Sequence, residues 1–211
     1  MTAIEREELM RGTKEGAPHT SKRIQDEALK LFFERGFKST TMREIALACG
    51  LTPGALYNHF SSKEELLGSM LVEIHREMES RLGAALQVAT SDPKEQLRSF
   101  AHAHALMHTV YIIEARVGNR EIGSVNGDVG AEVVRIRQWA TTTLRDILEL
   151  GRADGDFDVP NVAAVANLIL TMGMAIAKWY RTGGELTREE MADLHADMVM
   201  RMVSKQSGGR Q

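Results

Sequence analysis

Residues 41–60 read TMREIALACGLTPGALYNHF and contain the starts of two short helices in close succession. The first start is a capping box, in which Thr41 and Glu44 can each satisfy a backbone N–H of the other. The second start is Thr52–Pro53, an N-cap residue followed by a proline at the first helical position. Gly50 ends the first helix. Two short capped helices that meet at a glycine predict a helix-turn-helix motif.

The second helix has the side chains that a helix needs in order to enter the major groove of DNA. Its first residues must be small or polar, so that the backbone can approach base edges. These residues are Thr52, Pro53, Gly54 and Ala55. Hydroxyl and cationic groups around the helix can bind phosphates, as can the free N–H groups of helix N-termini. The groups predicted to do so are Thr40, Thr41, Tyr57, His59 and Lys63.

The rest of the chain has helical periodicity, without the strict alternation of a strand. Residues 20–35 place Ile24, Ala28, Leu31 and Phe32 on one apolar stripe. Further helices are predicted, from caps and stripes, over about 63–86, 93–109, 131–150, 160–181 and 187–203. A looser connection before residue 131 is predicted from Gly118, Gly123, Gly127 and Gly130. We therefore predict an all-α fold of roughly nine helices.

Composition excludes several classes of protein. The chain has 211 residues, 43% of them hydrophobic and 26% charged, which is unlike collagen-like, disordered or disulfide-scaffold sequences. The single cysteine, Cys49, cannot form an intrachain disulfide, and its alanine-rich surroundings favour a buried, inert thiol over a redox sensor. The first residues, MTAIEREELMRGTKEG, lack the apolar segment of a secretory signal. We expect a cytoplasmic protein.

The distribution of charge is more informative than the net charge. A formal charge of −3 and a pI of about 6.2 argue against a nucleic-acid-binding protein when taken alone. The formal net charge is −1 for residues 1–19, +3 for residues 20–63 and −5 for residues 64–211. A basic segment joined to a larger acidic one indicates that nucleic acid binds at one end of the chain only.

Residues 23–67 resemble the N-terminal domain of TetR-family transcriptional regulators along their whole length. The matching positions are Ile24, Ala28, Leu31, Phe32, Gly36, Phe37, Thr40, Thr41, Ile45, Ala46, Gly50, Gly54, Leu56, Tyr57, Phe60, Lys63 and Leu66. The resemblance implies that 40–49 is the positioning helix and 52–60 the recognition helix. It also implies a C-terminal domain that binds a ligand and forms a dimer.

The same resemblance implies roles for individual residues. Phosphate contacts are expected from Thr41, Tyr57, His59 and Lys63, and Arg43 is a further candidate for a contact with DNA. Contacts with base edges are expected from Pro53, Gly54, Ala55 and Asn58. Only Asn58 and Arg43 among these can form bidentate hydrogen bonds with a base, so the remainder would respond to methyl groups and DNA shape.

Residues 159–177, VPNVAAVANLILTMGMAIA, carry no charge and approach the length of a membrane span. Polar residues interrupt the segment, and an apolar stripe runs along it through Val165, Ile169, Met172, Ile176 and Trp179. We therefore predict no membrane contact, and a helix buried in a core or a subunit interface. The family architecture implies a homodimer through the helices near 160–181 and 187–203. Such a dimer would bind a palindromic operator of double-stranded DNA, with recognition helices about 34 Å apart.

The C-terminal part contains apolar and aromatic residues, many methionines and a few polar groups, which together suit a ligand pocket. The candidate ligand-binding residues are Phe100, His104, Met107, Tyr111, Arg116, Trp139, Met172 and Trp179. His104 and His108 stand at i, i+4 and could chelate a metal, but His102 points elsewhere and no nearby cysteine or acid completes a site. We therefore predict no metal and no cofactor. No catalytic constellation is present in the sequence, so an enzyme is not expected.

Two C-terminal segments, LRDILELGRADGDF and KWYRTGGELTREEMADLHADMVMRMV, resemble TetR-type regulators of fatty-acid or steroid catabolism, several of which respond to acyl-CoA thioesters. The resemblance implies an apolar or acyl-CoA-type effector, whose anionic end would meet Arg116, Arg120 or Arg181. We predict a repressor that binds its operator as a dimer and is released by this effector. The alternative is a small-molecule or metal-sensing protein with weak or vestigial DNA binding.

The predicted organisation has four parts. A disordered extension covers 1–19, and the DNA-binding domain covers 20–66. The ligand-binding and dimerisation domain covers 67–204, and a frayed tail covers 205–211.

Overall fold

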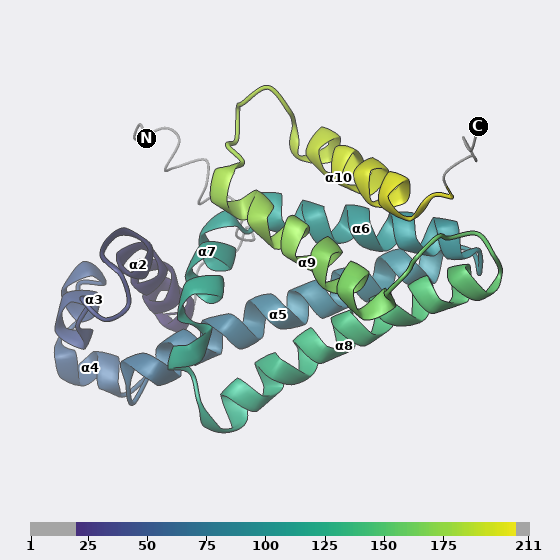
Figure 1. Ribbon diagram of the computed structural model, residues 1–211. Coiled ribbons are helices and arrows are strands. Elements are labelled where there is room, and N and C mark those ends of the chain that lie inside the picture. The colour runs from purple at the N-terminus through teal and green to yellow at the C-terminus, as the bar shows by residue number, and fades with distance from the viewer. Residues whose placement is uncertain (1–19, 206–211) are drawn as a thin grey trace. The chain divides into compact units, whose positions relative to one another are not determined.

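The computed structural model describes residues 20–205, so the predicted extension and nearly all of the predicted tail lie outside the described residues. Within this range the chain forms nine α-helices and one short 3-10 turn, and no strand, which confirms the all-α prediction (Figure 1). The elements are α2 (Thr20–Arg35), α3 (Met42–Ala48), α4 (Pro53–Tyr57), α5 (Lys63–Val88), α6 (Pro93–Val110), α7 (Ile112–Glu121), η1 (Ile122–Ser124), α8 (Gly127–Ala153), α9 (Val162–Trp179) and α10 (Arg188–Val203).

The helix starts predicted at Thr41, Thr52 and residue 187 are confirmed in the structure. At α3 the Thr41 hydroxyl accepts a hydrogen bond from the Glu44 N–H (3.2 Å), while the Glu44 carboxylate accepts one from the Thr41 N–H (2.8 Å). Thr187 and Glu190 form the same reciprocal pair at the start of α10. The Thr52 hydroxyl caps α4 by accepting from the N–H of Ala55 (3.2 Å). Local sequence therefore determines where these helices begin.

The predicted loose connection before residue 131 is wrong, because helix α7, the turn η1 and the first turn of α8 occupy it. Its glycines permit close packing in this segment. A Cβ atom on Gly118, inside α7, would lie 3.0 Å from a methyl carbon of Leu71, and one on Gly130 would lie 2.7 Å from the carbonyl oxygen of Val125. Gly127 begins α8 with φ +67°, a conformation that glycine adopts without strain.

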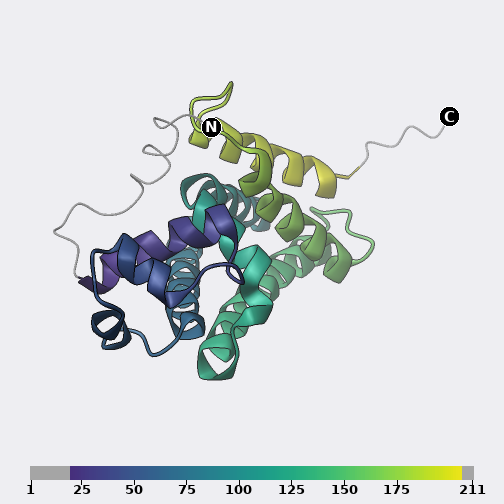
Figure 2. The same cartoon turned by 90° about the vertical axis from the view of Figure 1, so that its left-hand side faces the viewer.

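One compact unit comprises residues 20–75 and 111–134. Its core contains residues from α2 to α5 and from α7, including Ile24, Phe32, Ile45, Leu56 and Leu67. Helix α7 packs along α2, as both views show (Figures 1 and 2). The guanidinium of Arg120 on α7 donates to the carbonyl oxygen of Phe32 on α2 (2.6 Å). The helix-turn-helix is therefore held by a segment that follows it much later in the chain.

The second compact unit comprises residues 76–110 and 135–205. Helix α6 packs against both α9 and α10, and Phe100 lies fully buried in this core. Among the described residues, α9 is long and apolar enough to cross a membrane by length and composition, a test that the core helices of many proteins also pass. The buried face of α9 consists of Val162, Ala166, Ile169, Gly173, Ile176 and Ala177.

Candidate nucleic-acid interface

Helix α4 presents an exposed row of side chains above one buried anchor. Leu56 is fully buried in the core of its unit, which fixes the rotation of the helix about its own axis. On the opposite side Thr52, Pro53, Gly54 and Asn58 are exposed, and Tyr57 has 52% of its surface accessible. A Cβ atom on Gly54 would meet nothing within 4 Å, so the backbone there is open to a bulky partner. The residues predicted to contact base edges therefore share one accessible face, with Ala55 half-buried.

The recognition helix is shorter than the predicted range of 52–60. It ends at Tyr57, with Asn58 as its C-cap, and a turn follows in which the N–H of His59 donates to the carbonyl of Leu56 (2.9 Å). This turn brings Nδ1 of His59 within 3.2 Å of the Ser21 hydroxyl at the start of α2. No local sequence pattern could have indicated this contact, because its partners stand 38 positions apart.

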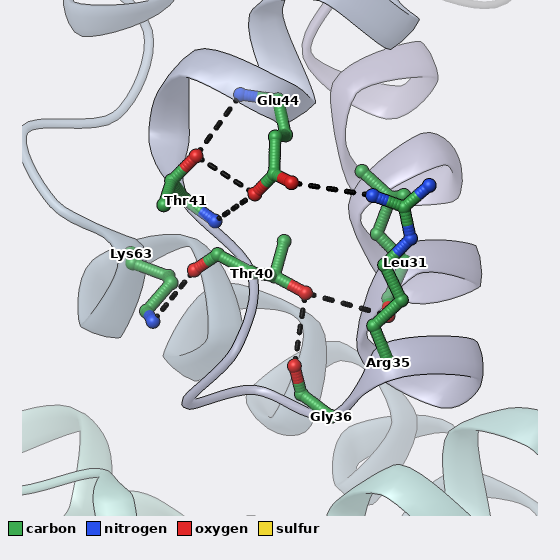
Figure 3. A network of polar contacts seen from close by, with 7 residues as sticks. All are labelled: Leu31, Arg35, Gly36, Thr40, Thr41, Glu44 and Lys63. Atoms are coloured by element: carbon green, nitrogen blue, oxygen red, sulfur yellow. Dashed lines mark hydrogen bonds and ion pairs between the residues drawn. The ribbon is translucent and has the colours of Figure 1, made fainter.

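The N-terminus of α3 already holds a carboxylate of the protein itself (Figure 3). The Thr41 hydroxyl donates to Oε2 of Glu44 (2.8 Å), and Nη1 of Arg35 donates to Oε1 (3.2 Å). Hydrogen bonds from the backbone and side chain of Thr41 hold the pKa of the Glu44 carboxyl below its ordinary value. A phosphate at Thr41 would therefore approach an ionised carboxylate. Arg43, which precedes Glu44 in the sequence, is exposed.

The prediction that Thr40 contacts phosphate through its side chain is wrong for this structure (Figure 3). Thr40 is 1% exposed, and its hydroxyl donates to the carbonyl oxygen of Gly36 (2.9 Å). Gly36 has φ +88°, which ends α2 and begins the turn that leads to α3. The hydroxyl of Thr40 thus stabilises the turn between α2 and α3 and is not accessible to DNA.

Lys63 also forms contacts inside the protein. Its ammonium group donates to the carbonyl oxygens of Phe37 (2.6 Å) and Thr40 (2.7 Å), and it lies 4.4 Å from the centre of the Phe37 ring. The bond to Thr40 is drawn in Figure 3. Two of the three N–H groups of the ammonium are therefore bound within the same unit. No local pattern around residue 63 could have indicated these partners.

The candidate ligand-binding residues are distributed over both compact units. Phe100, His104 and Met107 on α6 are buried in the second unit, where Trp139 and Met172 also lie half-buried against the core. Tyr111 and Arg116 belong to the first unit, where the guanidinium of Arg116 lies 5.7 Å from the centre of the Phe33 ring, and Trp179 is 56% exposed. Arg120, predicted to meet an anionic ligand, instead binds Phe32 and Glu121.

A surface groove of about 290 Å³ lies elsewhere in the second unit. Its lining residues are Leu86, Gln96, Thr143, Asp146, Ile147 and Leu150, none of which was a candidate ligand residue.

Three buried histidines lie together in the second unit. The ring of His104 stacks on Phe100 (6.2 Å between centres) and meets the ring of His108 edge to face (4.8 Å). His195 on α10 is the third, and no local sequence pattern could have linked it to His104, because α6 and α10 lie far apart in the chain. Burial lowers the pKa of His104 far below its ordinary value, with the neighbouring histidines adding to the effect, and burial lowers that of His195 to about 4.

No group of three potential ligand side chains within residues 20–205 is arranged to hold a metal ion. Nε2 of His102 lies 3.3 Å from a carboxylate oxygen of Glu189 on α10. Cys49 is 8% exposed and burial raises the pKa of its thiol, which confirms the buried thiol.

Comparison with known protein families accounts for most of the chain. Residues 24–70 match the family described as bacterial regulatory proteins, tetR family. Residues 90–203 match a second description, tetracyclin repressor-like, C-terminal domain. The first match covers the helix-turn-helix, and the second covers more than half of the sequence.

Individual proteins are similar along most of their length. The HTH-type transcriptional repressor KstR2 of Rhodococcus jostii is 33% identical over 188 residues, which cover 84% of this chain and 87% of that protein. A bacterial regulatory protein of the tetR family from Rhodococcus RHA1 superposes with a TM-score of 0.81 at 28% identity, covering 90% of this chain and 100% of that one. The structure of AibR in complex with isovaleryl coenzyme A and operator DNA gives a TM-score of 0.76 at 26% identity, covering 85% of this chain and 97% of that one.

Proposed function

Because this chain belongs to the TetR family of DNA-binding transcriptional regulators, which are not enzymes, we propose that it is a repressor released from its operator by a small effector. The observation that carries this proposal is the exposed face of α4, set above the buried Leu56. The similarity to the repressor KstR2 supports repression of transcription over activation. A cytoplasmic location is part of the proposal.

The DNA contacts divide into two groups. Thr52, Pro53, Gly54, Ala55 and Asn58 approach base edges, since they are small or polar and lie on α4 or at its ends. Thr41, Arg43, Tyr57 and His59 contact phosphates from the exposed ends of α3 and α4. Residues 20–66 form the DNA-binding domain in this proposal, and residues 67–204 form the ligand-binding and dimerisation domain.

The dimer forms through α9 and α10. Both helices have large apolar side chains exposed on the face that does not pack within the chain. This exposed α9/α10 stripe comprises Leu168, Trp179, Leu194, Met198 and Met202. Exposed apolar side chains on two consecutive helices are typical of a subunit interface. A two-fold axis through the stripe gives the two recognition helices that a palindromic operator requires.

The effector is an apolar or acyl-CoA-type molecule bound by the second unit. Support comes from the similar structure of AibR, which contains isovaleryl coenzyme A together with operator DNA. Two buried imidazole nitrogens in this unit, Nδ1 of His104 and Nε2 of His195, have no hydrogen-bond partner among residues 20–205. They supply polar groups for an effector beside the apolar side chains of Phe100, Met107 and Met172.

The test is an electrophoretic mobility shift on DNA from the region upstream of the chain's own gene. We expect a retarded complex on this DNA, none on unrelated DNA at the same concentration, and its loss when an acyl-CoA thioester is added. Free coenzyme A is the matched control for the acyl group. If the protein binds no upstream DNA, the proposal that it is a regulator is rejected. If the complex forms but persists in the presence of every thioester, only the proposed class of effector is rejected.

A further inference from the structure

Lys63, the first residue of α5, forms hydrogen bonds with the turn between α2 and α3. The ammonium of Lys63 donates to the carbonyl oxygens of Phe37 and Thr40, at 2.6 and 2.7 Å, and lies over the Phe37 ring. Phe37 is 4% exposed and packs edge to face on Phe32, with 5.1 Å between ring centres. The charge therefore sits on a buried, well-packed part of the turn.

The Thr40 carbonyl belongs to the peptide that leads directly into Thr41, the N-cap of α3. A hydrogen bond to this carbonyl restrains the orientation of that peptide and hence the position of the cap. From the other side, the Thr40 hydroxyl binds the carbonyl of Gly36. Lys63 and Thr40 thus hold the two ends of the turn, and Lys63 ties it to α5 (Figure 3).

We propose that Lys63 is a positioning residue, which holds the N-terminus of α3 against the start of α5 so that α3 and α4 meet DNA in the correct orientation. It does this through its bonds to the carbonyls of Phe37 and Thr40, and it does not act by neutralising a DNA phosphate. This inference rests on the proposed function. Arg43, an exposed cation on α3, provides the contrast, because its guanidinium is accessible to a phosphate.

Two measurements on the full chain separate these roles. The first is the slope of log Kd for operator DNA against log salt concentration, which falls by about one for each phosphate that a variant no longer binds. The second is amide hydrogen exchange in the DNA-free protein at Thr40 and Thr41, whose N–H groups donate to Phe37 and Glu44. The variants are Lys63→Met, which keeps an apolar stem without the cation, Lys63→Arg, and Arg43→Met as the matched control.

For Lys63→Met we expect operator binding about tenfold weaker, a salt slope within about 0.3 of the original, and exchange at Thr40 and Thr41 at least about tenfold faster. Lys63→Arg should restore slow exchange. Arg43→Met should lower the slope by about one and leave exchange at both amides unchanged. Far-UV circular dichroism confirms that each variant is folded.

A salt slope lowered by about one in Lys63→Met would overturn the proposal. Unchanged exchange at Thr40 and Thr41 in Lys63→Met would also overturn it. If Lys63→Met does not fold, the proposal is overturned when Lys63→Arg exchanges these two amides faster than the original protein does. If the original protein binds no upstream DNA, the proposed function fails, while the exchange measurement still decides whether Lys63 holds the turn.

Discussion

Gly173 on α9 leaves the space that the imidazole of His104 on α6 occupies, since a Cβ atom placed on Gly173 would collide with Nδ1 and Cε1 of that ring. His195 of α10 approaches the same point, with its Cε1 at 3.5 Å from the Cβ position. Gly173 is the only glycine in α9. Two buried histidines from different helices thus meet at the position where α9 lacks a side chain.

We expect Gly173→Ala to lower the free energy of unfolding by about 1–3 kcal/mol, because the added methyl group must displace a buried ring. Urea denaturation measures the change. The matched control is Gly83→Ala in α5, where a Cβ meets nothing within 4 Å. That variant should gain up to about 1 kcal/mol from helix propensity. Similar stabilisation of both variants would contradict the close packing at His104.

Stability should fall as the solution becomes more acidic, because burial lowers the pKa of His104 and lowers that of His195 to about 4. In the unfolded chain the histidine pKa is near 6.5. The unfolded state therefore binds more protons between these two values, and stability rises with pH through that window and levels off above it. For His195 alone the shift corresponds to roughly 3 kcal/mol, lost by about pH 4.

The measurement compares the unfolding free energy of the original protein and of His195→Gln from about pH 7 to about pH 4. Carboxylates titrate in both proteins, so the difference between the two curves isolates His195. We expect this difference to change by roughly 1–3 kcal/mol across the window, to the advantage of the variant at low pH. Parallel curves would show that His195 is not held neutral by burial.

Asn58→Ala should relax the preference for one base pair of the operator, with a loss of about 1–3 kcal/mol on the original sequence. Arg43→Ala should instead weaken binding to operator and random DNA alike and lower the salt slope by about one. Binding titrations on a set of single-base operator variants distinguish the two. An equal loss for Asn58→Ala on all sequences would assign Asn58 to the backbone of DNA.

Introducing a charge into the exposed α9/α10 stripe should separate the proposed dimer. Leu168 and Met198 are 59% and 41% exposed within the chain, so Leu168→Glu and Met198→Glu leave its core unchanged. We expect each to raise the dimer dissociation constant at least about tenfold in sedimentation equilibrium. Val88→Glu, at an 86% exposed position at the end of α5, is the control. Equal dimerisation of all three variants would place the interface elsewhere.

Thr40→Val should reduce stability by about 1–3 kcal/mol, because the partly buried carbonyl of Gly36 loses its hydroxyl partner. The salt dependence of DNA binding should not change, since the deleted hydroxyl is inaccessible. Ser39→Ala, at the exposed neighbouring position, should stay within about 0.5 kcal/mol of the original. An unchanged stability together with a lower salt slope would reinstate Thr40 as a phosphate contact.

Several parts of the structure could be predicted from sequence because they depend on neighbours a few residues away. The bounds of α2 agree with the predicted stripe, and the capping boxes at Thr41 and Thr187 lie where their spacing places them. The prediction of a loose connection before residue 131 is wrong, because the glycines in this segment do not interrupt its helices. Gly118 instead sits against Leu71, a residue of α5 that local spacing cannot connect to α7.

By itself the sequence determined the class of fold, the positions of the helix-turn-helix caps and the residues that α4 exposes, since periodicity and capping act within a few residues. Only the tertiary structure decided what the polar groups around that motif do. Lys63 binds the turn at Phe37 and Thr40, while His195 joins His104 beside Gly173. These partners lie on separate elements, and packing of the core, which acts between elements, determines which side chains meet.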